Sequence, residues 1–79
     1  MNKKCNLSEL QIGQRASVID LKISDRAIRR HLLDLGITRG TIVEIKKIAP
    51  MGDPVDIKLR DYELCIRKQD LKHIEVEMI

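Results

Sequence analysis

The fold is decided by the stretch Val55-Asp56-Ile57-Lys58-Leu59-Arg60-Asp61-Tyr62-Glu63-Leu64-Cys65-Ile66-Arg67. Apolar side chains occupy every second position on both sides of Arg60 and Asp61, which is the spacing of two half-buried β-strands. The two polar residues between the strands predict a tight hairpin, in which Asp61 is the residue that tolerates left-handed backbone. The sequence therefore predicts two adjacent strands over residues 55–60 and 62–67.

Three further segments have strand patterns. Residues 15–23 are rich in β-branched and aliphatic side chains, but they alternate imperfectly, which predicts a strand with a bulge. Residues 41–48 and 74–78 are expected to form two more strands, while residues 49–54 form a turn with two prolines, a glycine and an aspartate able to bond its own backbone. Five short strands and one inserted helix predict a mainly β fold, a small SH3-like antiparallel β-barrel that closes its edges on itself.

One real helix is expected over residues 25–35. Ser24 is a suitable N-cap residue, Asp25 is a favourable acid in the first turn, and Gly36 supplies the residue after the last turn. At 100° per residue, the apolar side chains of one stripe are Ala27, Ile28, Leu32 and Leu35. Shorter helical turns are expected at residues 7–14 and 68–73.

The length of 79 residues leaves room for one hydrophobic core, so residues 1–79 are expected to form a single domain. The core must be aliphatic, because Tyr62 is the one aromatic residue among Phe, Trp and Tyr. No stretch approaches the roughly 20 apolar residues of a membrane span, and the start Met1–Asn6 has no apolar run typical of a signal peptide. The protein is therefore expected to be cytoplasmic, with Cys5 and Cys65 as reduced thiols.

The net charge of +3 is concentrated in one segment. Residues 22–40 contain five basic residues against two acidic ones, which indicates a face for an acidic partner. Leu33 falls off the apolar stripe of the helix, between arginines, where it could supply apolar contact area. The predicted partner-binding surface has Arg29, Arg30 and Leu33 at its centre, with Met51 and Asp53 as weaker candidates.

The candidates for a catalytic or a metal-binding pattern are Cys5, Cys65, His31 and His73, and these residues are too scattered for either. The sequence therefore predicts no enzyme, no cofactor and no dedicated metal site. A nucleic-acid surface of the aromatic type and a groove for proline-rich peptides are not expected either, because both need several aromatic side chains.

Three blocks of sequence carry a resemblance to a known family. They are Leu7-Ser8-Glu9-Leu10 followed by Gly13-Gln14, then Arg30-His31-Leu32-Leu33-Asp34-Leu35-Gly36-Ile37-Thr38-Arg39-Gly40-Thr41, and finally Ala49-Pro50-Met51-Gly52-Asp53-Pro54. In order and spacing, from Leu7 to about Glu77, the chain resembles the FeoA family of ferrous iron transport accessory proteins. It departs from the family at Ile12, where proline is usual, and at Asp61, where glycine is frequent.

The resemblance implies an SH3-like barrel in the cytoplasm that assists the membrane ferrous iron transporter FeoB, whose cytosolic part is a GTP-binding domain. Such a protein would not be an enzyme and would meet the membrane only through its partner. The alternative is a metal-responsive or nucleic-acid-binding module related to the C-terminal domain of diphtheria-toxin-repressor-like metalloregulators. Against it, the chain is expected to be complete in itself, and it has no helix-turn-helix pattern.

Overall fold

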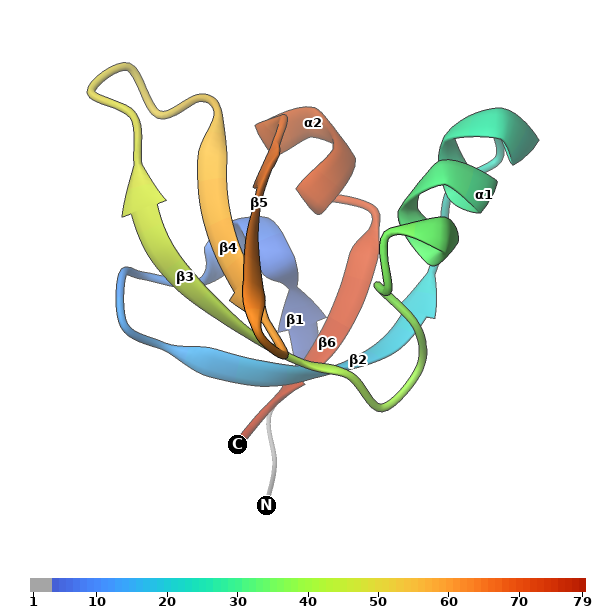
Figure 1. The fold of residues 1–79 in the computed structure, drawn as a ribbon, viewed down its shortest axis with the longest axis horizontal. Helices are drawn as coiled ribbons and strands as arrows, with labels where there is room; N and C mark the ends of the chain where they lie inside the picture. The colour runs from blue at the N-terminus through green and yellow to red at the C-terminus, as the bar shows by residue number, and fades with distance from the viewer. Residues whose placement is uncertain (1–3) are drawn as a thin grey trace.

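The computed structural model describes residues 4–79, which form one curled antiparallel sheet with helices at its ends (Figure 1). The strands are β1 (Lys4–Asn6), β2 (Arg15–Leu21), β3 (Ile42–Ile48), β4 (Val55–Leu59), β5 (Tyr62–Ile66) and β6 (Ile74–Met78). The helices are the 3₁₀ turn η1 (Leu7–Glu9), α1 (Arg26–Asp34) and α2 (Lys68–Leu71). Residues 1–3, part of the start examined for a signal peptide, lie outside the described residues. None of the helices in residues 4–79 has the length and apolar character needed to cross a membrane.

The predicted fold class, mainly β with one inserted helix, is confirmed. The strand order is β1-β6-β2-β3-β4-β5, so the sheet contains one strand more than the five that were expected. The additional strand, β1, pairs with β6 through Cys5 and Val76, and three residues are too few to show an alternating pattern in sequence. Among the described residues β1 and β5 do not pair with each other, so hydrogen bonds do not close the barrel as expected.

Two irregularities in pairing bend the sheet. Along β2 and β6 the register shifts between Val18 and Asp20, which is the bulge predicted for this strand. A second shift between Ile45 and Lys47 bends β3 against β4. Because a bulge increases local twist and bends its strand, these two sites let a single sheet curl around one core.

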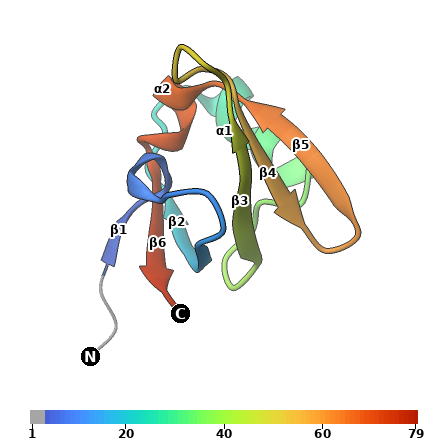
Figure 2. The same cartoon turned by 90° about the vertical axis from the view of Figure 1, so that its left-hand side faces the viewer.

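The core is aliphatic, as predicted. Its most deeply buried large side chains come from strands, turns and the short helix α2, and they include Leu7, Ile37, Ile45, Ile57, Leu59, Leu71 and Ile74. Figures 1 and 2 show α1, α2 and the β3–β4 loop toward one end of the barrel. The α1–β3 connection and the β4–β5 turn lie toward the other end.

The limits and the buried side of α1 differ in detail from the prediction. The N-cap is Asp25, not Ser24, because its Oδ1 accepts hydrogen bonds from the backbone N–H groups of Ala27 (2.9 Å) and Ile28 (3.2 Å). Ala27, expected on the buried stripe, is exposed, whereas Leu33 is half-buried and packs against the core. Leu33 reaches back to the core from the flank of the helix because its side chain is long, and the methyl group of Ala27 is too short to do so.

The β4–β5 hairpin is confirmed, but its left-handed residue is Arg60 (φ 54°), not Asp61. Leu59 pairs with Tyr62, so the turn has two residues and Arg60 takes the first position. Positive φ at that first position is what the primed two-residue turns require to match the twist of the strands.

Candidate functional site

The outer face of α1 carries three arginines around one half-buried leucine. A surface depression of about 460 Å³ is lined by Arg26, Arg29, Arg30, Leu33 and Asp34. These positions are three or four residues apart, so they share one side of the helix. Three positive charges and one negative charge give this depression a net charge of +2. It is therefore suited to an acidic surface with an apolar protrusion.

The arginines differ in how they are held. Arg29 Nε donates a hydrogen bond to the backbone oxygen of Leu21 (3.4 Å), which ties its guanidinium group to the end of β2. Within residues 4–79, Arg26 and Arg30 have neither an ion pair nor a side-chain hydrogen bond. A carboxylate of another molecule could therefore pair with them without breaking an internal contact.

Leu33 has two roles in this geometry. It is half-buried and packs against the hydrophobic core, and it also lines the depression between the arginines. A substitution at Leu33 would therefore change the stability of the domain as well as the surface.

Met51 and Asp53 lie elsewhere. Met51 is 94% exposed on the β3–β4 loop, which Figure 1 shows separated from α1 by α2. Asp53 Oδ1 accepts a hydrogen bond from the backbone N–H of Lys68 (2.8 Å), so the carboxylate holds the start of α2. The sequence had predicted a bond from this side chain to its own backbone instead. The structure thus brings Arg29, Arg30 and Leu33 together and leaves Met51 and Asp53 apart from them.

Two residues of the depression, Arg26 and Asp34, were not among the predicted site residues. Their signal was present in the sequence. Arg26 precedes Arg29 by three residues and Asp34 follows Arg30 by four, so helical spacing alone places both on the same face.

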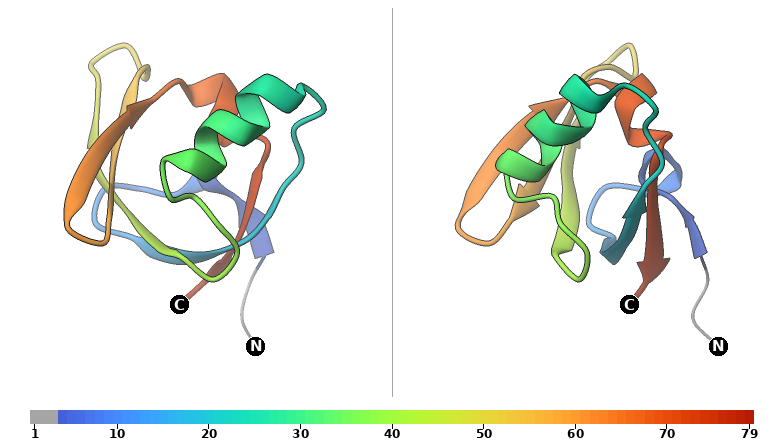
Figure 3. Two further views of the ribbon diagram at one scale, coloured as in Figure 1. Left: turned by 45° about the vertical axis from the view of Figure 1, so that its right-hand side comes forward. Right: turned by 90° about the vertical axis from the view of Figure 1, so that its right-hand side faces the viewer.

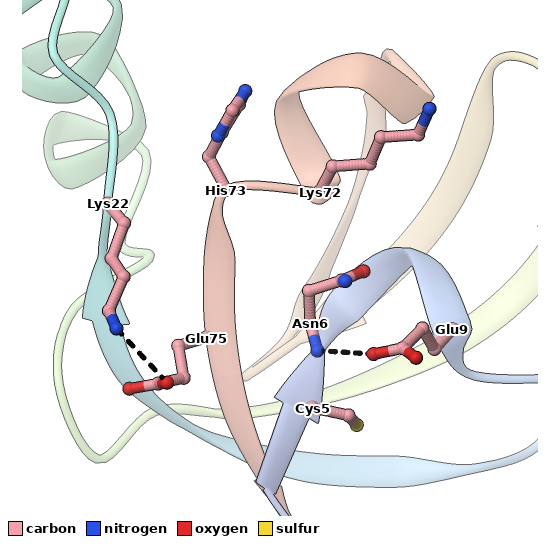
Figure 4. A pocket seen from close by; sticks show the side chains of 7 residues that line it. All are labelled: Cys5, Asn6, Glu9, Lys22, Lys72, His73 and Glu75. Atoms are coloured by element: carbon pink, nitrogen blue, oxygen red, sulfur yellow. Dashed lines mark hydrogen bonds and ion pairs between the residues drawn. The ribbon is translucent and has the colours of Figure 1, made fainter.

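A different depression, of about 360 Å³, gathers residues with ionisable side chains, and Figure 4 shows Cys5, Asn6, Glu9, Lys22, Lys72, His73 and Glu75 around it. Its carboxylates are occupied: Glu75 Oε2 lies 3.3 Å from Lys22 Nζ, and Glu9 Oε2 accepts a hydrogen bond from the backbone N–H of Asn6 (2.8 Å). The imidazole of His73 points away from the thiol of Cys5 (Figure 4). In the part of the chain described, no three His, Cys, Asp or Glu side chains are grouped to hold a metal ion.

The exposed thiol of Cys65 lies on β5 opposite Asp56 of β4. A hydrogen bond to the Asp56 carboxylate, with smaller contributions from desolvation and negative charge, raises the pKa of Cys65 above its ordinary value. A raised pKa leaves less thiolate at neutral pH, so this cysteine is a poor nucleophile and a poor metal ligand.

A curled antiparallel sheet with one inserted helix defines a small SH3-like domain. The FeoA domain family matches residues 5–78. The chain therefore belongs to the FeoA family.

Two solved structures that are similar to this chain agree with this assignment. The FeoA-like protein of Clostridium acetobutylicum is 40% identical with a TM-score of 0.88, and the match covers 100% of this chain and 91% of that chain. The FeoA of Stenotrophomonas maltophilia, solved with zinc and described as a procaryotic SH3 domain protein, is 27% identical with a TM-score of 0.79, covering 90% of this chain and 87% of that chain.

A larger relative joins two proteins in one chain. A Porphyromonas gingivalis protein, described as a fusion of Fe(2+) transport protein A and the Fe(2+) transporter FeoB, is 34% identical over 74 residues. The match covers 92% of this chain but 8% of the relative, so this chain spans less than a tenth of that protein.

A likeness of fold alone extends to a manganese-dependent transcriptional repressor. That structure has a TM-score of 0.88 at 11% identity, and the match covers 100% of this chain and 44% of that chain.

Proposed function

We propose that this protein is a cytoplasmic accessory or regulatory protein for ferrous iron uptake, acting by direct contact with the cytosolic part of a FeoB-type transporter. The FeoA family is associated with ferrous iron transport, and the fusion of the two proteins in a relative supports the choice of partner. A covalent link raises the effective concentration of one protein at the other. Their fusion is therefore expected for two proteins that act in contact. In this proposal the membrane is approached only through the transporter.

The observation that carries the proposed contact is the outer face of α1. Leu33 offers apolar area in the lining of the depression, and Arg26 and Arg30 offer guanidinium groups with no partner inside the described chain. Such a surface binds through desolvated contact at its centre, while the charges at its rim orient an acidic partner and accelerate encounter. Because the arginines are exposed, the electrostatic part of the affinity falls as the salt concentration rises.

The second function considered from the sequence, a metal-responsive or nucleic-acid-binding module, rests on a likeness of fold alone. A metal-responsive site would need several ligands in one place, and residues 4–79 contain no group of three His, Cys, Asp or Glu side chains.

The test is a binding measurement with charge-neutralising variants. Arg26→Gln with Arg30→Gln removes two positive charges from the α1 face and leaves Leu33 and the Arg29–Leu21 hydrogen bond in place. The dissociation constant for the purified cytosolic region of a FeoB-type transporter should rise about tenfold, with a weaker dependence on salt. Calorimetric titration at two salt concentrations measures both quantities.

A matched control has the same change in net charge. Lys58→Gln with Lys72→Gln removes two positive charges from exposed positions on β4 and after α2. This variant should bind within about twofold of the unchanged protein, since exposed charges away from a contact contribute little to its free energy. If both double variants weakened binding equally, or if neither weakened it, the contact would lie away from α1.

A further inference from the structure

A second cationic depression lies between the α1–β3 connection and the β4–β5 turn, toward the end of the barrel opposite α2 (Figure 3). It has a volume of about 420 Å³ and is lined by Thr38, Arg39, Gly40, Thr41, Ile42 and Arg60. None of these residues is acidic, whereas the α1 depression includes Asp34 and the depression of Figure 4 includes Glu9 and Glu75. The two arginines, 21 positions apart in sequence, therefore share one concave surface without a carboxylate in its lining.

The connection that carries Arg39 is held by hydrogen bonds within itself and to Val18 of β2. The backbone N–H of Thr38 donates to Gly36 O (2.9 Å), that of Gly40 donates to Val18 O (2.8 Å), and that of Thr41 donates to Thr38 O (3.0 Å). The hydroxyl groups of Thr38 and Thr41 lie 2.9 Å apart and bond to each other. These donors are occupied within the loop and by β2, and the guanidinium groups of Arg39 and Arg60 are donors available to a ligand.

Arg39 itself is oriented by the sheet. Its Nε donates a hydrogen bond to the backbone oxygen of Ile19 (3.1 Å), the residue at the bulge of β2. This contact uses one of the five N–H groups of the guanidinium, and the two terminal amino groups remain for a second partner. A positioned arginine loses less freedom on binding than a mobile one.

Arg60 occupies a position that favours glycine. Among residues 4–79 it is the one non-glycine residue with positive φ, at 54°. Left-handed backbone is unfavourable for a residue with a β-carbon, and the geometry of the two-residue turn holds Arg60 in it. Within residues 4–79 neither Arg39 nor Arg60 forms an ion pair, and Arg60 does not pair with its neighbour Asp61. Two like charges in one depression repel until an anion joins them.

We propose that this depression, through Arg39 and Arg60, binds a phosphate group. Two guanidinium groups present several N–H donors to the oxygens of one tetrahedral anion, and their total charge of +2 matches a phosphate dianion. A carboxylate would neutralise half of that charge. Free phosphate and the phosphate of an ester present the same group to the two arginines.

The test is a titration of the full chain, labelled with ¹⁵N, followed by amide chemical shifts. Inorganic phosphate, at ionic strength held constant with chloride, should give saturable shifts at residues 38–42 and 60. A parallel titration with glucose 6-phosphate distinguishes the sources: tighter binding of the ester identifies an esterified ligand, and tighter binding of inorganic phosphate identifies the free ion. Acetate at the same ionic strength should give shifts that do not saturate over the same range.

Arg60→Gly is the decisive variant. Glycine relieves the left-handed backbone, so the melting temperature should not fall, while the affinity for phosphate should drop at least about tenfold with the loss of one charge-assisted contact. Arg26→Gln with Arg30→Gln, on the α1 face, should bind phosphate as the unchanged protein does. Unaltered phosphate binding by Arg60→Gly, or equal shifts with acetate and phosphate, would overturn the proposal.

Discussion

Gly36 lies where α1 ends and where the side chain of Tyr62 covers the end of the helix. Its φ of +101° is left-handed, and the hydroxyl of Tyr62 donates a hydrogen bond to the backbone oxygen of Leu35. A β-carbon added at Gly36 would lie 2.7 Å from that hydroxyl oxygen. The one Tyr, Phe or Trp side chain of the sequence therefore joins β5 to α1, and glycine is needed at the junction for both backbone and space.

Substitutions at Gly36 and Gly40 separate the cost of backbone strain from the cost of the missing space. Gly40 also has positive φ (+89°), but a β-carbon there would have no neighbour within 4 Å. Gly40→Ala should therefore cost about 1 kcal/mol of unfolding free energy from backbone strain alone. Gly36→Ala should cost about 1 kcal/mol more, because it also displaces Tyr62 from Leu35. Urea unfolding measures both values, and equal losses would show that the Tyr62 contact does not contribute to stability.

At the scale of elements, the sequence predicted the helices and strands whose position is set by a local pattern of residues. Strict alternation located β4 and β5, imperfect alternation in β2 indicated its bulge, and Gly36 marked the end of α1. Three-residue β1 escaped detection because its place depends on pairing with β6.

The candidate site also contains residues that local spacing places and residues that only the tertiary fold places. Helical spacing was enough to bring Arg29, Arg30 and Leu33 to one depression, since all three belong to one short helix. The place of Met51 and Asp53 depends on where the β3–β4 loop docks, and no local pattern encodes the contact of Asp53 with Lys68. For the same reason the sequence did not show that Arg39 and Arg60 share a depression.

The contact of Asp53 with α2 gives a prediction at this scale. Arg67, the N-cap residue of α2, makes no side-chain capping bond, and the Asp53 carboxylate provides one from another loop. Asp53→Ala should therefore cost about 1 kcal/mol, the usual value of a lost cap, and Asp53→Asn should cost less because it keeps an acceptor. Hydrogen exchange at residues 68–71 should accelerate in the alanine variant. Unchanged protection of the Lys68 amide would show that this cap is not needed.

At the scale of the whole molecule, one small aliphatic barrel carries two cationic surfaces, the α1 depression and the Arg39–Arg60 depression. The radius of gyration is 11.4 Å, and the sheet that carries both surfaces is bent by two bulges around one continuous core. The α1 depression has a net charge of +2, and the Arg39–Arg60 depression also has +2, while the whole chain has +3. The other residues of the chain therefore carry a net charge of −1, so an acidic partner is attracted to the two depressions more than to the rest of the chain.

The most direct test of the proposed contact is to observe which residues the transporter touches. The ¹⁵N-labelled protein is titrated with the unlabelled cytosolic region of a FeoB-type transporter, and amide shifts and line widths are followed at low and high salt. The strongest changes are expected at residues 26–34 of α1, and they should weaken as the salt concentration rises. Changes confined to the β3–β4 loop or to the depression of Figure 4, or no changes at saturating concentration of the transporter region, would contradict it.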